Sequence, residues 1–237
     1  MPNCIWSQKM LIAIEGIDGS GKGTQAAQLL ERTRKLGYTS ELVSFPRYKD
    51  TRCSKMVAAY LNGEFGTLEE VPPVFAATLF ALDRLESRAH IERACEENDL
   101  VIVDRYVASN LAYQSARITN PERATFTEWL FNLEYEIYDL PKPDLTFFLE
   151  VPAHTSKELV GRKETRTYTE KVYDLHERDS MYLSSVREVY HALITSRVID
   201  PCLIIDCQDR HGILRAMDDI GQEVCDAVIQ FKNSNAG

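Results

Sequence analysis

A glycine-rich segment carries the strongest chemical signal in the chain. Residues 15–25, EGIDGSGKGTQ, follow an apolar run and contain Gly16 and Gly21 at the spacing Gly-x-x-x-x-Gly-Lys. Glycines let a backbone fold tightly enough for its N–H groups to face an anion, and the start of a following helix adds partial positive charge. The sequence therefore predicts a phosphate-binding loop in which Lys22 reaches toward the β- and γ-phosphates of a nucleotide.

One metal ligand that usually belongs to such a loop is missing, because Gly23 stands where Ser or Thr is usual. Thr24 lies about 100° further round the helix. Magnesium often keeps several waters and uses one or two carboxylates, so Asp18 is a candidate ligand and a serine at position 23 should be tolerated. The predicted nucleotide-binding set is Gly16, Gly19, Ser20, Gly21, Lys22, Gly23 and Thr24.

The elements that must position this loop follow from hydrophobic periodicity. Apolar runs predict buried strands, and longer segments between them predict helices. Strands are expected at residues 10–14, 40–45, 100–104, 145–151 and 202–206, and helices at 23–36, 72–98, 108–140, 171–195 and the C-terminal end. This alternation predicts an α/β fold with a five-stranded parallel sheet flanked by helices. Ligands of such sheets bind beyond the carboxyl ends of the strands.

Composition limits the partners and the location. The 237 residues carry a net charge of −9, which argues against nucleic acid and an anionic membrane; the length predicts a single domain, residues 1–237. No apolar run approaches the ~18 residues that span a bilayer. Six scattered cysteines lack metal-binding spacing and indicate free thiols in a reducing compartment. We therefore expect a cytoplasmic protein.

Four further segments, together with the glycine-rich loop, resemble the thymidylate kinase family between about residues 11 and 206. They are FPRY (45–48), LFALDR (79–84), DRYVASNLAY (104–113) and LPKPD (140–144). The family transfers the γ-phosphoryl of ATP to dTMP. The resemblance implies a P-loop kinase fold with a small mobile lid at about residues 160–172, ATP and Mg²⁺ as cofactors, dTMP and ATP as the small-molecule partners, and a homodimer.

The resemblance assigns a base-binding role to Phe80 and Arg84, which lie at i and i+4 on one helix face. A flat apolar ring can stack on a pyrimidine, and a guanidinium can donate to a base carbonyl. The family places Asn110 and Tyr113 near the base and the deoxyribose. A Tyr ring against C2′ would exclude a 2′-hydroxyl. The other residues predicted to bind the phosphoryl acceptor, dTMP, are Phe45, Arg47 and Tyr48.

The phosphates need cations, because phosphoryl transfer brings two anions together. Lys22 and Arg105 are the expected catalytic cations, and Asp104 is expected to orient Arg105 or a metal-bound water. Asp18 matches the acid in the family's phosphate-binding loop. The resemblance implies that it takes part in catalysis, binds dTMP and contributes to the metal site. Some family members carry Arg directly after that acid.

Here the position after the acid is Gly19, so the resemblance moves catalytic charge to the lid. Arg162 and Arg166 are the expected lid cations, and Glu177 is expected to join the metal site. Two alternatives stay open at this stage. A different nucleoside monophosphate kinase, adenylate-like, fits the loop alone. A nucleotide-dependent switch is the other alternative, although the chain contains no Asn-Lys pair for guanine recognition.

Overall fold

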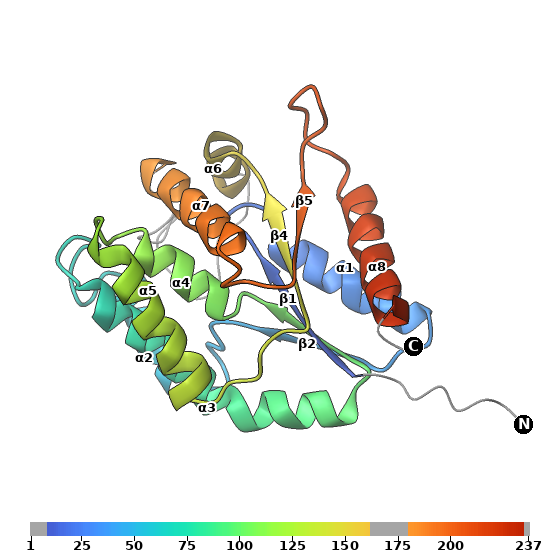
Figure 1. The fold of residues 1–237 in the computed structure, drawn as a ribbon, viewed down its shortest axis with the longest axis horizontal. Coiled ribbons are helices and arrows are strands. Elements are labelled where there is room, and N and C mark those ends of the chain that lie inside the picture. The colour runs from blue at the N-terminus through green and yellow to red at the C-terminus, as the bar shows by residue number, and fades with distance from the viewer. Residues whose placement is uncertain (1–8, 162–179, 235–237) are drawn as a thin grey trace, which may run out of the picture.

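A computed structural model describes residues 9–161 and 180–234, and its centre is one parallel sheet (Figure 1). The strands are β1 (Met10–Glu15), β2 (Ser40–Ser44), β3 (Leu100–Asp104), β4 (Leu145–Glu150) and β5 (Cys202–Asp206). They lie in the order β2-β3-β1-β4-β5, and each neighbouring pair is parallel. The predicted five-stranded parallel sheet is confirmed.

Helices connect the strands and cover the sheet. They are α1 (Lys22–Lys35), α2 (Cys53–Leu61), α3 (Pro73–Glu97), α4 (Val107–Ser115), α5 (Glu122–Asn132), α6 (Ala153–Gly161), α7 (Ser180–Thr195) and α8 (Met217–Ser234), with a π-helical segment, η1, at Leu133–Ile137. The helical region expected at 108–140 is divided. Pro121 disfavours helix at the residue before it, and α5 starts directly after this proline. Helices α2 and α6 were not predicted.

The central strands β1, β3 and β4 are buried on both faces, whereas the edge strand β5 exposes Leu203 and Ile204. Successive side chains of a strand point to opposite sides of the sheet. Ile12 and Ile14 of β1 join a core formed with α1 and α8, whereas Leu11 and Ala13 join a second core formed with α3, α4 and α7. Figure 1 shows α1 and α8 together on one side of the sheet.

The three adjacent strands β2, β3 and β1 end at the same edge of the sheet. This edge receives the glycine-rich loop after β1, Phe45 after β2, and Arg105 after β3. The sheet therefore places phosphate-loop residues and acceptor-side residues next to each other, although up to 90 positions separate them in the sequence.

Candidate active site

The glycine-rich loop joins β1 to α1 in the conformation that its glycines allow. Gly21 is the N-cap of α1 and has φ 87°, a left-handed conformation that side chains disfavour. Gly16 has φ 148°, and a Cβ there would lie 2.9 Å from the carbonyl oxygen of Leu149. The loop thus approaches β4 closely and leads directly into a helix N-terminus, where anions are favoured.

Lys22 is buried inside this loop rather than extended into solvent. Its Nζ donates a hydrogen bond of 2.7 Å to the carbonyl oxygen of Ile17. Burial, followed by the nearby charge of Arg105, lowers the pKa of Lys22 to about 7, although the carboxylates of Asp18 and Asp104 act in the opposite direction. The lysine and Arg105 therefore lie close enough to share one anionic ligand.

Gly23 is packed against the end of β3. A Cβ at position 23 would lie 3.0 Å from Oδ2 of Asp104. The other oxygen, Oδ1 of Asp104, is buried and has no hydrogen-bond partner among the described residues. The space that a Ser or Thr side chain would occupy at position 23 is thus partly taken by a carboxylate.

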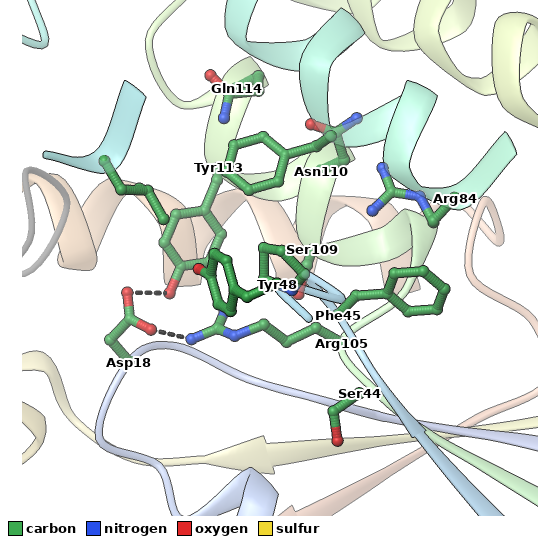
Figure 2. A pocket seen from close by; sticks show the side chains of 13 residues that line it. Asp18, Ser44, Phe45, Tyr48, Arg84, Arg105, Ser109, Asn110, Tyr113 and Gln114 are labelled. Atoms are coloured by element: carbon green, nitrogen blue, oxygen red, sulfur yellow. Dashed lines mark hydrogen bonds and ion pairs between the residues drawn. The ribbon is translucent and has the colours of Figure 1, made fainter. Parts of the chain in front are cut away.

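A cavity of about 300 Å³ lies beside the loop (Figure 2). Its walls come from α3, α4, the loop after β1 and the segment after β2. The lining residues are Asp18, Ser44, Phe45, Pro46, Tyr48, Leu61, Phe80, Arg84, Arg105, Ser109, Asn110, Tyr113 and Gln114. Asp18 and Arg105 lie toward one end, and Arg84 lies toward the other (Figure 2).

At the loop end of the cavity, the Asp18 carboxylate is held by two donors. Nη2 of Arg105 donates to Oδ1, and the Tyr113 hydroxyl donates to Oδ2 at 2.8 Å. The Arg105 guanidinium also lies over the Tyr113 ring, 5.5 Å from its centroid. Burial and the Asp18 carboxylate raise the pKa of Tyr113 well above its usual range, so its hydroxyl stays protonated and keeps donating.

At the far end, a buried carboxylate from η1 holds two of the lining residues. Glu134 is fully buried and accepts from Nε and Nη2 of Arg84, the latter at 2.7 Å. It also accepts from Nδ2 of Asn110 at 2.8 Å. Burial lowers the pKa of Arg84, but the Glu134 carboxylate outweighs this effect and the pKa is raised. Sequence reasoning missed Glu134, because the segment NLEYEI contains a second acid, Glu136, and nothing in it distinguishes the two.

A second buried carboxylate, Glu15 at the end of β1, contacts the start of α4. It accepts from the backbone N–H groups of Tyr106 and Ser109 and from the hydroxyls of Ser109 and Tyr190. The N-cap of α4, Tyr106, makes no side-chain cap of its own. Glu15 therefore satisfies two of the N–H groups that a helix start leaves unpaired. It too was missed, because the sequence shows it only as the last residue of an apolar run.

Comparison with known proteins decides the family. Residues 14–209 match the family model described as thymidylate kinase. The chain is a member of the thymidylate kinase family. Thymidylate kinase from Mycobacterium tuberculosis is 38% identical over 185 residues, which cover 78% of this chain and 85% of that protein. A probable thymidylate kinase from Thermococcus kodakarensis is 32% identical over 177 residues, covering 71% of this chain and 80% of the relative.

A solved structure of thymidylate kinase from Candida albicans shares the fold. It superposes with a TM-score of 0.73 at 24% identity and covers 97% of this chain and 94% of its own. The predicted P-loop kinase fold, typical of the thymidylate kinase family, is confirmed by this agreement together with the sheet order.

Most of the acceptor residues predicted from the thymidylate kinase resemblance meet in one cavity. Those that line it are Asp18, Phe45, Tyr48, Phe80, Arg84, Arg105, Asn110 and Tyr113. Arg47 does not line it. The Arg47 guanidinium pairs with Asp50 at 3.2 Å and borders a neighbouring surface depression instead.

The remaining predictions concern the lid and the metal. Arg162, Arg166 and Glu177, with most of the lid expected at 160–172, lie outside the described residues. Within residues 9–161 and 180–234, no group of three His, Cys, Asp or Glu side chains could hold a metal ion. Asp104 keeps an unpartnered buried oxygen, whereas both oxygens of Asp18 are already hydrogen-bonded.

The low pKa of Lys22 predicts proton uptake when ATP binds. At pH 8 a lysine with a pKa of about 7 is mostly neutral in the free protein, and nearby phosphates favour its charged form. Calorimetry of ATP binding in two buffers of different protonation enthalpy should therefore show uptake of up to about one proton at pH 8 and less at pH 6. A Lys22→Met variant that takes up as many protons as the wild type would contradict this origin.

The contact between Gly23 and Asp104 revises the expectation that serine is tolerated at position 23. The new Cβ would press on Oδ2 of Asp104, and the carboxylate would have to move. Gly23→Ser should lower kcat about tenfold and raise the magnesium concentration for half-maximal rate, because it displaces a preorganised carboxylate. Lys35→Ser, which places a serine at the exposed end of the same helix, serves as a control for expression. A magnesium requirement that is unchanged or lower would contradict the prediction.

Proposed function

We propose that this protein transfers the γ-phosphoryl of ATP to dTMP, giving dTDP and ADP for dTTP synthesis, with the loop at residues 16–24 holding the donor phosphates and the adjoining cavity holding dTMP. The observation that carries the assignment is the cavity itself. It combines an aromatic ring, Phe80, and a buried guanidinium, Arg84, with a second guanidinium, Arg105, beside the loop lysine. A pyrimidine and a phosphate at opposite ends of one small ligand match this arrangement.

The chemistry assigned to these residues is positioning and charge neutralisation, on which phosphoryl transfer mainly relies. Lys22 holds the donor phosphates. Arg105 breaks its ion pair with Asp18 and holds the acceptor phosphate near them. Phe80 stacks on the base and is itself supported by the edge of Tyr60, with ring centroids 6.2 Å apart and planes at 88°. Asp18, once released by Arg105, can accept from a sugar hydroxyl.

The carboxylate set fits a magnesium ion on one side of the loop. Asp104 offers a buried oxygen with no partner among the described residues, and hard cations such as Mg²⁺ take oxygen ligands. We assign Asp104 as the residue that holds Mg²⁺, directly or through water, with Asp18 as the second acid. When bound, the ion would neutralise charge on the phosphate oxygens.

A panel of monophosphates tests the proposed function. Wild-type protein with ATP and magnesium should phosphorylate dTMP with the highest kcat/KM among dTMP, dUMP, dCMP, dGMP, UMP and AMP. Highest activity with AMP would assign the adenylate-type reaction instead. Hydrolysis of a nucleoside triphosphate without any acceptor turnover would overturn the kinase assignment.

Tyr113 should discriminate against ribonucleotides at the sugar. Its hydroxyl is anchored on Asp18 at 2.8 Å and its ring lines the cavity, so the ring cannot swing aside to admit a 2′-hydroxyl. Tyr113→Ala should reduce the preference for dTMP over ribothymidine monophosphate about tenfold or more, because exclusion by the ring is lost. The ratio of kcat/KM values measures this effect. Tyr38→Ala, in a ring that packs under Lys232 far from the cavity, is the control; an unchanged ratio in Tyr113→Ala would remove the ring from the sugar site.

We also propose that the protein forms a homodimer and acts in the cytoplasm. Apolar side chains are exposed near the start of α3, Phe65, Val74 and Phe75 among them, and they support a homodimer formed through helix faces; sedimentation at micromolar concentration tests it. No helix among the described residues is long and apolar enough to cross a membrane. The described cysteines are free, which supports a cytoplasmic location that cell fractionation can test.

A further inference from the structure

Glu134 contacts two residues that line the cavity, Arg84 and Asn110, at the end away from the glycine-rich loop (the base end). It comes from the π-helical segment η1 and has no exposed surface. Its two oxygens accept from Nε and Nη2 of Arg84 and from Nδ2 of Asn110. π-Helical turns are rare and frequently occur at functional sites. One carboxylate thus fixes side chains from two different helices, α3 and α4.

These contacts leave a defined pair of groups for a ligand. The Nη1 group of Arg84 has no hydrogen bond to the described residues, and it can only donate. The amide nitrogen of Asn110 is used by Glu134 and by the carbonyl oxygen of Ala77 at 2.9 Å. The amide oxygen, Oδ1, is buried without a partner in the described part of the chain, and it can only accept. Arg84 and Asn110 therefore present one donor and one acceptor to a ligand.

We propose that Glu134 is the positioning residue that makes this cavity read thymine rather than cytosine. Thymine presents a carbonyl acceptor at position 4 next to an N–H donor at position 3. Cytosine presents the reverse, an amino donor next to a ring-nitrogen acceptor. The donor of Arg84 and the acceptor of Asn110 complement thymine. This inference rests on the proposed function, because it takes a pyrimidine nucleotide as the ligand of the cavity.

Glu134 sets this polarity because a carboxylate accepts and does not donate. An Asn side chain can rotate its amide by 180° and exchange the positions of its oxygen and nitrogen. At Asn110 the exchanged orientation would place Oδ1 against Oε1 of Glu134 and the carbonyl oxygen of Ala77, two acceptors. The carboxylate therefore holds the nitrogen end of the amide and leaves the oxygen end for the ligand. The same carboxylate fixes the rotation of the Arg84 guanidinium by a two-point contact.

The test is Glu134→Gln, which keeps the side-chain size and adds a donor. Gln can face either end of the Asn110 amide, so the acceptor is no longer fixed. We expect kcat/KM for dTMP relative to dCMP to fall on the order of 10- to 100-fold, the effect of an unpaired buried group, with KM for ATP unchanged. Glu92→Gln, which removes an exposed partner of Arg88 on the same helix as Arg84, and Val224→Ala, which loosens the core under α8, should both keep the wild-type ratio.

An analogue separates positioning from general loss of structure. Methylation at N3 of dTMP removes the N–H that Asn110 is expected to receive, so the wild type should discriminate strongly against N3-methyl-dTMP. Glu134→Gln should weaken this discrimination about tenfold or more. A folded Glu134→Gln protein with unchanged dTMP-to-dCMP and dTMP-to-methyl ratios would overturn the inference.

A replacement of the whole ion pair covers the case in which Glu134→Gln does not fold. Arg84→Met with Glu134→Leu removes both buried charges, a change that proteins often accept. This double variant should again lose discrimination against N3-methyl-dTMP about tenfold, and full retention would overturn the inference. A wild type that fails to phosphorylate dTMP would overturn the proposed function and this inference with it. An active wild type with unchanged ratios in the variants overturns the inference alone.

Discussion

Lys22→Ala should lower kcat about 10²- to 10³-fold, the usual effect of removing one preorganised charge-stabilising donor. Lys22 sits in the loop that leads into α1, and its ammonium group rests on the carbonyl oxygen of Ile17. This position is inside the protein and beside Arg105. A fixed cation needs no rearrangement of solvent when charge moves to the transferred phosphoryl group, so its loss should appear in kcat rather than in the KM for dTMP.

The control for this variant lies on the same helix. Lys35 is exposed at the end of α1 and pairs with Glu31 at 2.6 Å, so Lys35→Ala removes a lysine of α1 without touching the site. It should keep turnover within about twofold, since exposed ion pairs contribute little. Single-turnover kinetics would separate the chemical step from product release. Near-normal kcat in a folded Lys22→Ala protein would remove Lys22 from the transferred group.

Features that depend on neighbouring residues in the sequence could be predicted: the buried strands, the glycine-rich loop and the shared face of one helix. Continuous apolar runs such as residues 10–14 are buried on both faces of the sheet, and the order of strands and helices follows from them. The glycine-rich loop could be placed because Gly16 and Gly21 need conformations that few residues adopt. The spacing of Phe80 and Arg84 predicted a shared helix face, and both line the cavity.

The parts that depend on distant pairings could not be predicted. Glu134 meets Arg84 across 50 positions, and Glu15 meets Ser109 across 94; nothing near either acid in the sequence indicates its partner. Arg47 is a further example. The FPRY segment, through the thymidylate kinase resemblance, predicts that Arg47 contacts a phosphate, and in this structure its guanidinium pairs with Asp50, three residues away. Motif spacing carries no information on which of several nearby groups a side chain prefers.

Glu15→Ala should lower the free energy of unfolding by at least about 3 kcal/mol, because it leaves several buried donors without a partner. The carboxylate accepts from the backbone N–H of Tyr106 at 2.7 Å, from the Ser109 hydroxyl at 2.6 Å and from the Tyr190 hydroxyl at 2.8 Å. Glu15 is fully buried, so water does not readily replace it. A single residue thereby connects β1, the start of α4 and α7, and its removal should weaken all three contacts at once.

The size of the loss tests what Glu15 contributes beyond volume. Glu15→Gln keeps one acceptor oxygen, and the hydroxyls of Ser109 and Tyr190 can turn to accept from its amide, so this variant should lose less stability than Glu15→Ala in urea unfolding. Glu31→Ala, which removes an exposed acid, should stay within about 0.5 kcal/mol of wild type. The start of α4 leads to Asn110 and Tyr113, so both Glu15 variants should also raise the KM for dTMP more than the KM for ATP. A Glu15→Gln protein as stable as the wild type, with a loss only in Glu15→Ala, would show that Glu15 fills space and that the start of α4 is held by other contacts.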